Sequence, residues 1–513
     1  MVFSSSVFLF VFLPLVVLVY FLMPSRSLKN VILLIASLIF YAWGEPVYIG
    51  LMIISILANW VFGIAIDASK DRKKLYLVLD LIVNLAILGF FKYEGFFAEN
   101  VNAIAGFALV PDLELPLPIG ISFYTLQAVS YIIDVYRGEV PAQRNPLYLG
   151  MYIAMFPQLV AGPIVRYSTI QDQILNRKES LSGFAAGARL FCVGLAKKVL
   201  LANVCAILAV DMLSRDPSEI GVIGAWGGLI AYTFQIFFDF SGYSDMAIGL
   251  GKMFGFEYLR NFNYPYISRS ITEFWRRWHI SLSSFFRDYI YIPLGGSRVT
   301  KARWMFNLFA VWFLTGFWHG AAWNYILWGL FYLCVLLFEK FFLLQRMDKI
   351  PVVLQHVYTI IVFMFGWLLF WIEDMGQMGQ YFLAMFGVFG STGTSTAWEL
   401  GIWSYVPVFV VCAIASTPVM PWLRAKLCAW VQGVKLENFM KTDLPNPKML
   451  ETGKLCDWDR YIPASVLATL PKNRVNIYAA AMVIVDLSLL VLLLLSIFSV
   501  LSGSFNPFIY FRF

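Results

Sequence analysis

Long runs of apolar residues recur along the chain and limit its fold more than any other feature of the sequence. Two of them, Val7–Met23 and Ala479–Val500, are long enough or nearly long enough to cross a hydrocarbon core about 30 Å thick. A third, Ala310–Phe338, is interrupted at His319. Of the 513 residues, 60% are hydrophobic and 13% are charged, whereas soluble domains have about 25% charged residues. The sequence therefore predicts an all-α polytopic membrane protein.

The apolar segments predict roughly 11–13 transmembrane helices in a single membrane domain that covers residues 1–513. The N-terminal run lacks a positive start and a small-residue cleavage site, so we expect a retained first helix and no signal peptide. Residues 255–305 are rich in Gly, Pro and Arg, which is typical of re-entrant or interfacial helices. Residues 421–475 hold nine Lys/Arg, five Asp/Glu and five Pro, which predicts a polar cytoplasmic loop.

Basic and acidic loops alternate between the first spans. A basic cluster covers Lys70–Lys74, whereas Tyr93–Pro116 carries four acidic residues and no Lys or Arg. Basic loops face the cytoplasm in membrane proteins. The pattern therefore predicts an N-terminus outside, and the same bias accounts for the net charge of +7 without nucleic-acid binding.

Polar residues gather at the end of an apolar run in the stretch "DFSGYSDMAIGLGKMFGF", which starts at Asp239. Carboxylates are costly at membrane depth and often mark functional sites there. We expect Asp239, Ser241 and Tyr243 to line a substrate-binding chamber. A helix end capped by its own Ser and Asp side chains is an equally acceptable interpretation.

The stretch "SRSITEFWRRWHISLSSFFRDYIYIPLGGSR" begins with a capping box at Ser270 and Glu273, which predicts a helix start. Helical spacing would place Glu273 near Arg277 and Trp275 near His279. The mixture of rings and cations fits a mouth for an anionic ligand with an aromatic ring, because arginines bind phosphates. A membrane-surface helix would have the same composition. The candidate binding residues are Trp275, Arg276, Arg277, Arg287 and Asp288.

The stretch "LTGFWHGAAWNYILWG" contains His319, one of three histidines in the chain, and a further candidate binding residue, Asn324. An ionisable group within a membrane segment is expensive and predicts a functional site. Since burial favours the neutral imidazole, His319 is a candidate general base. His356 has no comparable neighbours, and we expect a structural role for it.

The sequence lacks the motifs of several common catalytic and metal-binding sites. The sequence contains no G-x-S-x-G turn and no Walker A loop. His279 and His319 are forty positions apart without further soft ligands nearby, and the six cysteines have no ligand spacing. We therefore expect no metal and no permanently bound cofactor.

The segments "ITEFWRRWHISLSSFFRDYIYIPLGG" and "LTGFWHGAAWNYILWG" closely resemble the membrane-bound O-acyltransferase (MBOAT) family, and within it the bacterial alginate O-acetylation branch. "LPIGISFYTLQAVSYIIDVYRGEVPAQRN", "FPQLVAGPIVRY" and "FDFSGYSDMAIGLGKMFGF" resemble the same group. The similar segments are spread over most of residues 1–335 and recur at the C-terminal "FNPFIYFRF", whereas 421–475 matches nothing in the family pattern.

The resemblance implies a funnel of many helices with His319 deep in the membrane and His279 as a second catalytic position. It implies acetyl transfer from cytoplasmic acetyl-CoA across the bacterial inner membrane. In such systems an extracytoplasmic SGNH-type O-acetyltransferase then modifies a polysaccharide, here an alginate-like exopolysaccharide or peptidoglycan. His319 would act as a general base or form a covalent acyl-histidine, and His279 would orient the attack or bind the oxyanion.

Three other functions remain open from the sequence. The first is D-alanyl transfer to teichoic acid from a carrier protein. The second is a transporter or flippase without covalent chemistry. The third is a scaffold that only recruits an extracellular transferase.

Overall fold

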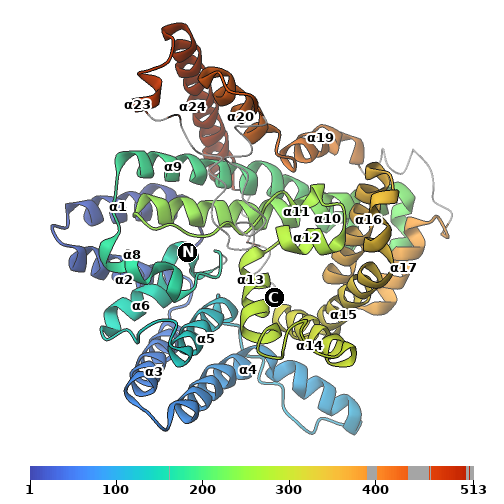
Figure 1. Ribbon diagram of the computed structural model, residues 1–513. Coiled ribbons are helices and arrows are strands. Elements are labelled where there is room, and N and C mark those ends of the chain that lie inside the picture. Colours follow the sequence, from blue (N-terminus) through green and yellow to red (C-terminus); the bar gives the residue numbers. More distant parts are fainter. Residues whose placement is uncertain (161, 390–400, 437–461, 463, 504–507, 509–513) are drawn as a thin grey trace.

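The structure is a computed structural model that describes residues 1–160, 162–389, 401–436, 462, 464–503 and 508. Every regular element in these residues is a helix (Figure 1), which confirms the all-α prediction. The first half of the chain contains η1 (Phe8–Phe12), α1 (Leu13–Leu22), α2 (Arg26–Ala42), α3 (Ile49–Ala68), α4 (Lys73–Ala105), α5 (Ile121–Arg137), α6 (Pro146–Ala154), α7 (Phe156–Leu159), α8 (Tyr167–Asn176), α9 (Leu181–Ala196), η2 (Lys197–Ala202), α10 (Asn203–Ser214) and α11 (Pro217–Met253).

The second half places several short helices between longer ones. In chain order it contains η3 (Pro265–Ile267), α12 (Ile271–Arg277), α13 (Ile280–Phe286), η4 (Arg287–Tyr291), α14 (Lys301–His319), α15 (Trp323–Phe338), η5 (Glu339–Leu343), η6 (Leu344–Lys349), α16 (Val352–Trp371), α17 (Met375–Met385), η7 (Ile402–Tyr405), α19 (Val406–Ala415), α20 (Val419–Gln432), α23 (Ala464–Leu467) and α24 (Lys472–Leu501).

Seven helices of the described residues are long and apolar enough to cross a membrane, or eight if the bent pair α19–α20 forms one span. The sequence predicts more, roughly 11–13, because it counts every apolar segment. Helix α5 shows why some segments fall short. It has 17 residues, and its polar Ser122, Gln127 and Asp134 are buried by protein. Because such a helix touches little lipid, it need not be uniformly apolar.

Helix α4 corrects one sequence prediction. The acidic segment Tyr93–Pro116 was expected to be a loop, but α4 continues through Tyr93 to Ala105 and ends at Gly106 with φ 76°. A left-handed glycine is a common helix terminator. With 33 residues, α4 is longer than a membrane crossing of about 20 residues requires. The charged end of this helix therefore lies beyond the apolar layer without breaking the helix.

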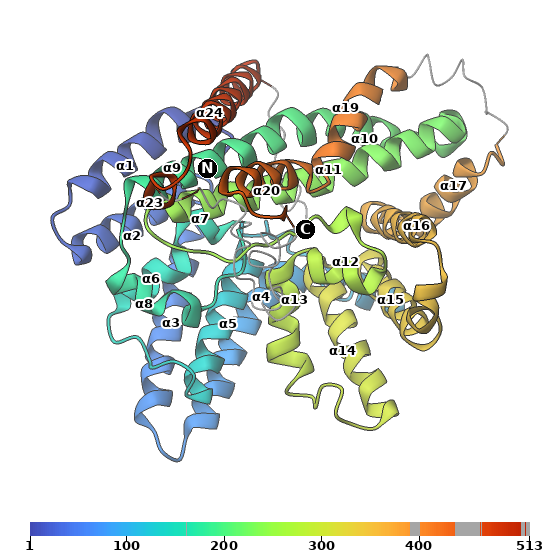
Figure 2. The same cartoon turned by 45° about the horizontal axis from the view of Figure 1, so that its top comes forward.

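The segment 255–305 contains only short helices before α14 begins at Lys301, as expected. Helices α12 and α13 have seven residues each, too few to cross a bilayer. In Figure 2 they lie in the middle of the molecule, between α3–α5 on one side and α14–α16 on the other. Of the predicted loop 421–475, most of α20, all of α23 and the start of α24 are helical, whereas residues 437–461 and 463 lie outside the described part.

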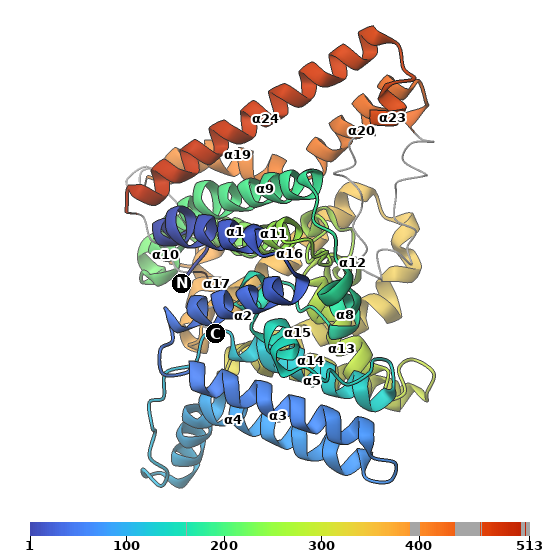
Figure 3. The same ribbon diagram turned by 90° about the vertical axis from the view of Figure 1, so that its left-hand side faces the viewer.

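The start of α5 and the end of α14 meet the middle of α4, at Lys92 and Tyr93, in the interior. The start of α4, the end of α5 and the start of α14 carry basic residues, Lys73, Arg137 and Lys301. At 1.5 Å per residue, about 27 Å of helix separates Lys301 from the last residue of α14, His319. In Figure 3 the α3–α4 and α13–α14 connections lie on one side of the molecule and the α4–α5 connection lies on the other. The basic helix ends therefore share one face.

Candidate active site

His319 is the last residue of α14, and the chain leaves the helix there in an extended conformation at Gly320. Helix α15 begins at Trp323, so the predicted interruption of the apolar run is confirmed. The side chain is 5% exposed. Its ring centre lies 4.9 Å from that of Trp328 and 5.4 Å from that of Phe370, both nearly perpendicular. His319 is thus held in an aromatic environment inside the protein and not against lipid.

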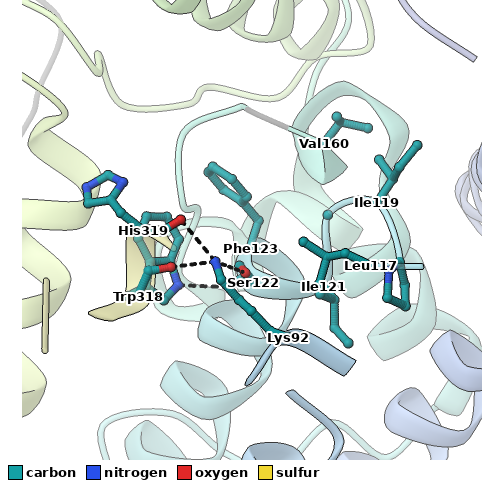
Figure 4. Close-up of a pocket in the computed structure, with 11 residues that line it drawn as sticks. Lys92, Leu117, Ile119, Ile121, Ser122, Phe123, Val160, Trp318 and His319 are labelled. Carbon is teal, nitrogen blue, oxygen red and sulfur yellow. Dashed lines mark hydrogen bonds between the residues drawn. The ribbon is translucent and has the colours of Figure 1, made fainter. Parts of the chain in front are cut away.

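A pocket reaches the residue from one side. Its cavity volume is about 30 Å³, far smaller than a site that encloses a whole small molecule. In Figure 4 the main chain of His319 faces Lys92, while the imidazole points away from Lys92 and from Leu117, Ile119 and Val160. The lining residues are Lys92, Leu117, Pro118, Ile119, Gly120, Ile121, Ser122, Phe123, Val160, Trp318 and His319.

His279 precedes α13 in a left-handed conformation with φ 45°. Such a conformation costs a non-glycine residue about 1–3 kcal/mol and persists only where the surroundings impose it. Here the backbone N–H of Ile280 donates to the carbonyl of Asn261 at 2.9 Å, and the N–H of Asn263 donates to the carbonyl of Arg277 at 2.9 Å. These bonds fix the turn that carries the imidazole.

The Asn261 amide determines which nitrogen of His279 carries the proton. Its Oδ1 accepts from the backbone N–H of Ser281 at 3.1 Å, and a backbone N–H only donates. The amide atom at this position is therefore the oxygen. His279 Nδ1 lies 3.1 Å from the same oxygen and must donate to it. The neutral imidazole then presents its Nε2 as a proton acceptor.

The two histidines lie close together although they come from different elements. The centre of the Trp318 indole lies 6.4 Å from the His279 ring and 5.0 Å from the His319 ring. The Phe240 ring packs edge-on against His279 at 4.7 Å. The structure thus brings together the two residues that the sequence and the family resemblance marked as catalytic.

The predicted helix start at Ser270 is confirmed. Its side chain accepts from the backbone N–H of Glu273 at 3.0 Å, and Glu273 pairs with Arg277 at 2.7 Å. The predicted helical pairing of Trp275 with His279 is wrong, because α12 ends at Arg277 and His279 has left-handed backbone angles. Arg277 also donates to the carbonyl of Asn263 at 3.1 Å. Arg276 is exposed on α12.

The rings of Trp328 and Phe370 form an aromatic wall against His319, and Trp275 and Asn324 lie behind this wall. The Trp275 ring packs 5.5 Å from that of Trp328, which in turn contacts His319. The buried Asn324 amide donates to the carbonyl of Phe370 at 3.1 Å, and Phe370 forms the other face of the wall. Both residues therefore support the aromatic environment without lining the pocket.

The Asp239 stretch lies inside the long helix α11 and not at a helix end. The carboxylate of Asp239 forms an ion pair with Lys198 at 2.6 Å, and both side chains are almost fully buried. Tyr243 stacks on Phe3 at 4.5 Å, and Ser241 is buried in the same helix. These three predicted residues do not line the pocket. Their neighbour Phe240, on the same helix, does contact the site, since its ring packs against His279 at 4.7 Å.

Arg287 and Asp288 belong to a charged cluster at the basic ends of the helices. Asp288 accepts from Arg287 at 2.7 Å and pairs with Arg166 at 2.7 Å. Burial alone would raise the pKa of Asp288, but the hydrogen bonds from Arg287 and Arg166 outweigh it and lower the pKa. The guanidinium groups of Arg137 and Arg166 lie 5.2 and 5.0 Å from the Tyr289 ring. Cations and an aromatic ring thus share this face.

Sequence reasoning missed Lys92, Ser122 and Asn261. Lys92 had an available signal, because it is a lone cation within the apolar run "LGFFKYEGFF". It directly precedes Tyr93–Pro116, the segment that was expected to be a loop. Ser122 and Asn261 had no comparable signal, since their contacts depend on how separate elements pack.

The part of the chain that contains the site is similar to known proteins. A family model described as "MBOAT, membrane-bound O-acyltransferase family" matches residues 140–375, which include both histidines. The chain is 39% identical over 520 residues to the "Probable alginate O-acetylase AlgI" of Azotobacter vinelandii, covering 100% of both chains. The "Peptidoglycan O-acetyltransferase" of Helicobacter pylori is 38% identical over 364 residues, 64% of this chain and 68% of the relative. A "Teichoic acid D-alanyltransferase" of Streptococcus thermophilus is 32% identical over 231 residues, 42% of this chain and 54% of the relative.

The tautomer of His279 can be read directly, because the chain has only 3 histidines. His356 Nδ1 also lies 3.1 Å from a carbonyl, that of Ser268, so the spectrum is recorded in a His356→Ala background. With isotope-labelled histidine, nitrogen NMR at neutral pH should then show the His279 imidazole protonated at Nδ1 and unprotonated at Nε2. Asn261→Leu should remove the acceptor and move this signal toward the opposite tautomer. Ser281→Ala, which keeps the Asn261 oxygen, should leave it in place. A proton on Nε2 of His279 while Asn261 is in place would contradict the assignment.

Proposed function

The chain belongs to the membrane-bound O-acyltransferase family, and we propose that it is an O-acetyltransferase for an exported polysaccharide. It takes acetyl from cytoplasmic acetyl-CoA and passes it across the membrane. An alginate-like exopolysaccharide is the preferred polymer, because the similarity to an alginate O-acetylase covers the whole chain. Peptidoglycan is the second choice, since that relative matches 64% of the chain.

One observation carries the proposal. His319 ends a helix beside a pocket, with its imidazole buried among aromatic rings, and a second imidazole, that of His279, lies next to the same Trp318 indole. An ionisable side chain at this depth needs a reason to be there. Acyl transfer supplies one, because a neutral imidazole can take the proton of an attacking hydroxyl at neutral pH.

The reaction passes one proton through His319, in two transfers, and exchanges the group bound to the acetyl carbon. His319 takes the proton of the acceptor hydroxyl while the oxygen attacks the thioester carbonyl. The C–S bond then breaks, and the coenzyme A thiolate leaves with the proton that His319 gained. His279 presents Nε2 as an acceptor, so it suits orienting a substrate N–H or O–H better than binding an oxyanion. A covalent acetyl-histidine would be a two-step variant of the same transfer.

The donor would approach from the basic face. Coenzyme A is a polyanion with an adenine ring, and this face presents arginines together with aromatic side chains. Arg276 is the freer of the α12 pair, since Arg277 is bonded to Glu273 and Asn263. Arg287 is paired with Asp288 and would hold phosphate as part of that cluster. The pantetheine arm would then extend along the helices toward the histidines.

We place the protein in the bacterial inner membrane with its N-terminus outside, because basic connections gather on one face. The acidic α4–α5 connection, which contributes Leu117–Gly120 to the pocket, would then face the exterior. The partner on that side would be an SGNH-type O-acetyltransferase that places the acetyl group on the polymer. D-alanyl transfer is less favoured, because that relative matches 42% of the chain.

His319→Ala should abolish polysaccharide acetylation while the protein still accumulates in the membrane. Loss of a general base lowers turnover by about 10²- to 10⁴-fold. The measurement is acetyl transfer by purified protein in proteoliposomes, with acetyl-CoA as donor.

His356→Ala is the matched control, because its Nδ1 lies 3.1 Å from the Ser268 carbonyl and away from the pocket. That variant should transfer acetyl at the unmodified rate. A D-alanyl carrier protein offered in place of acetyl-CoA should not be consumed. Normal acetylation by His319→Ala would exclude an enzymatic role for this histidine and leave a transporter or scaffold.

The double change Arg276→Ala and Arg277→Ala should weaken the binding of acetyl-CoA. Loss of a charge-assisted contact to phosphate raises the KM for acetyl-CoA by about tenfold, with little change in kcat. The exposed Arg346, on η6, provides a control change to alanine that should leave KM unaltered. An unchanged KM for acetyl-CoA in the double variant would contradict a binding role and favour the interpretation of α12 as a membrane-surface helix.

A further inference from the structure

We infer that Lys92, helped by Tyr93, is a positioning residue that holds the end of α14 and thereby fixes His319. The inference rests on the proposed function and deepens it. Lys92 is a buried cation on α4, far in sequence from both histidines. No step of the transfer described above uses it.

Helix α14 ends without the termination that neighbouring helices have. Helices α4 and α5 end at glycines in the left-handed conformation, Gly106 with φ 76° and Gly138 with φ 73°. The glycine after α14, Gly320, is extended with φ −163°. Gly320 is needed for lack of space and not for a left-handed turn, because a Cβ there would lie 2.2 Å from the Tyr325 ring. The last carbonyls of α14 therefore need donors from elsewhere.

Helix α4 supplies those donors to three successive carbonyls. The Tyr93 hydroxyl donates to the carbonyl of Phe317 at 2.8 Å. The Lys92 ammonium donates to the carbonyls of Trp318 at 2.6 Å and His319 at 3.2 Å (Figure 4). The Tyr93 and Phe317 rings also stack at 4.1 Å. A cation at the C-terminus of a helix is favoured by the helix dipole as well.

The third donor of Lys92 fastens the same point to α5. It lies 3.1 Å from Ser122 Oγ, and the Trp318 indole N–H lies 3.4 Å from the Ser122 carbonyl. An ammonium has three N–H donors, and all three are now engaged. Lys92 thus ties α4, α5 and α14 together at the residue that carries the imidazole.

The number of hydrogen bonds that Lys92 already makes distinguishes a positioning role from substrate binding. With its three donors used, Lys92 has none left for a substrate. In Figure 4 the imidazole of His319 also points away from the ammonium. Lys92 therefore acts through the backbone of His319 and not on the reacting atoms.

The test separates turnover from donor affinity. Lys92→Met removes the donors but keeps the length of the side chain. It should lower kcat by about 10- to 100-fold, since a small misplacement of a catalytic group costs this much, with KM for acetyl-CoA essentially unchanged. Lys92→Arg restores N–H donors and should recover part of the loss. Tyr93→Phe should lower kcat less, again without a change in KM.

Controls keep the outcome readable. Tyr148→Phe removes an exposed hydroxyl contact to Ser27 and should behave as the unmodified protein. If Lys92→Met fails to accumulate, Lys92→Arg and Tyr93→Phe carry the test. The inference is overturned if these variants keep the unmodified kcat, or if the loss appears in KM. The unmodified protein and His319→Ala are measured alongside, so an inactive unmodified protein counts against the proposed function and not against Lys92.

Discussion

A helix that ends inside a membrane protein leaves carbonyl groups that water cannot reach, and this constraint shapes the centre of the molecule. Helix α14 ends at His319, and α4 provides hydrogen-bond donors to its last three carbonyls. The break that presents the imidazole is therefore stable only while α4 and α5 stay packed against it. The same contacts satisfy the backbone groups and place His319, the proposed catalytic group.

The two histidines are fixed by different means. His319 is held through its backbone and by aromatic rings on both sides. His279 is held through its side chain by Asn261, on a turn with left-handed backbone angles. One indole, that of Trp318, lies beside both rings. Contacts from the protein itself thus hold both rings, which suits the proposed reaction in a buried site.

The sequence predicts the class of fold well, because apolar run length is a direct consequence of membrane thickness. It also predicts the break at His319 and the helix start at Ser270, which depend on local residues. It fails where a polar residue depends on a distant partner. Asp239 pairs with Lys198, on the preceding helical segment, and no periodicity reveals that pairing. Lys92 was missed because the acidic residues after it resemble a loop, although the first two, Glu94 and Glu99, belong to the last turns of α4.

The central claim is that acetyl passes from one side of the membrane to the other through the site that contains His319. The most direct measurement uses proteoliposomes in which the basic face of the protein points outward and labelled acetyl-CoA is added outside. A polysaccharide acceptor with its extracytoplasmic transferase is enclosed in some vesicles and added outside in others. The account predicts label on the enclosed polymer alone. Label only on polymer that shares a compartment with acetyl-CoA would contradict it.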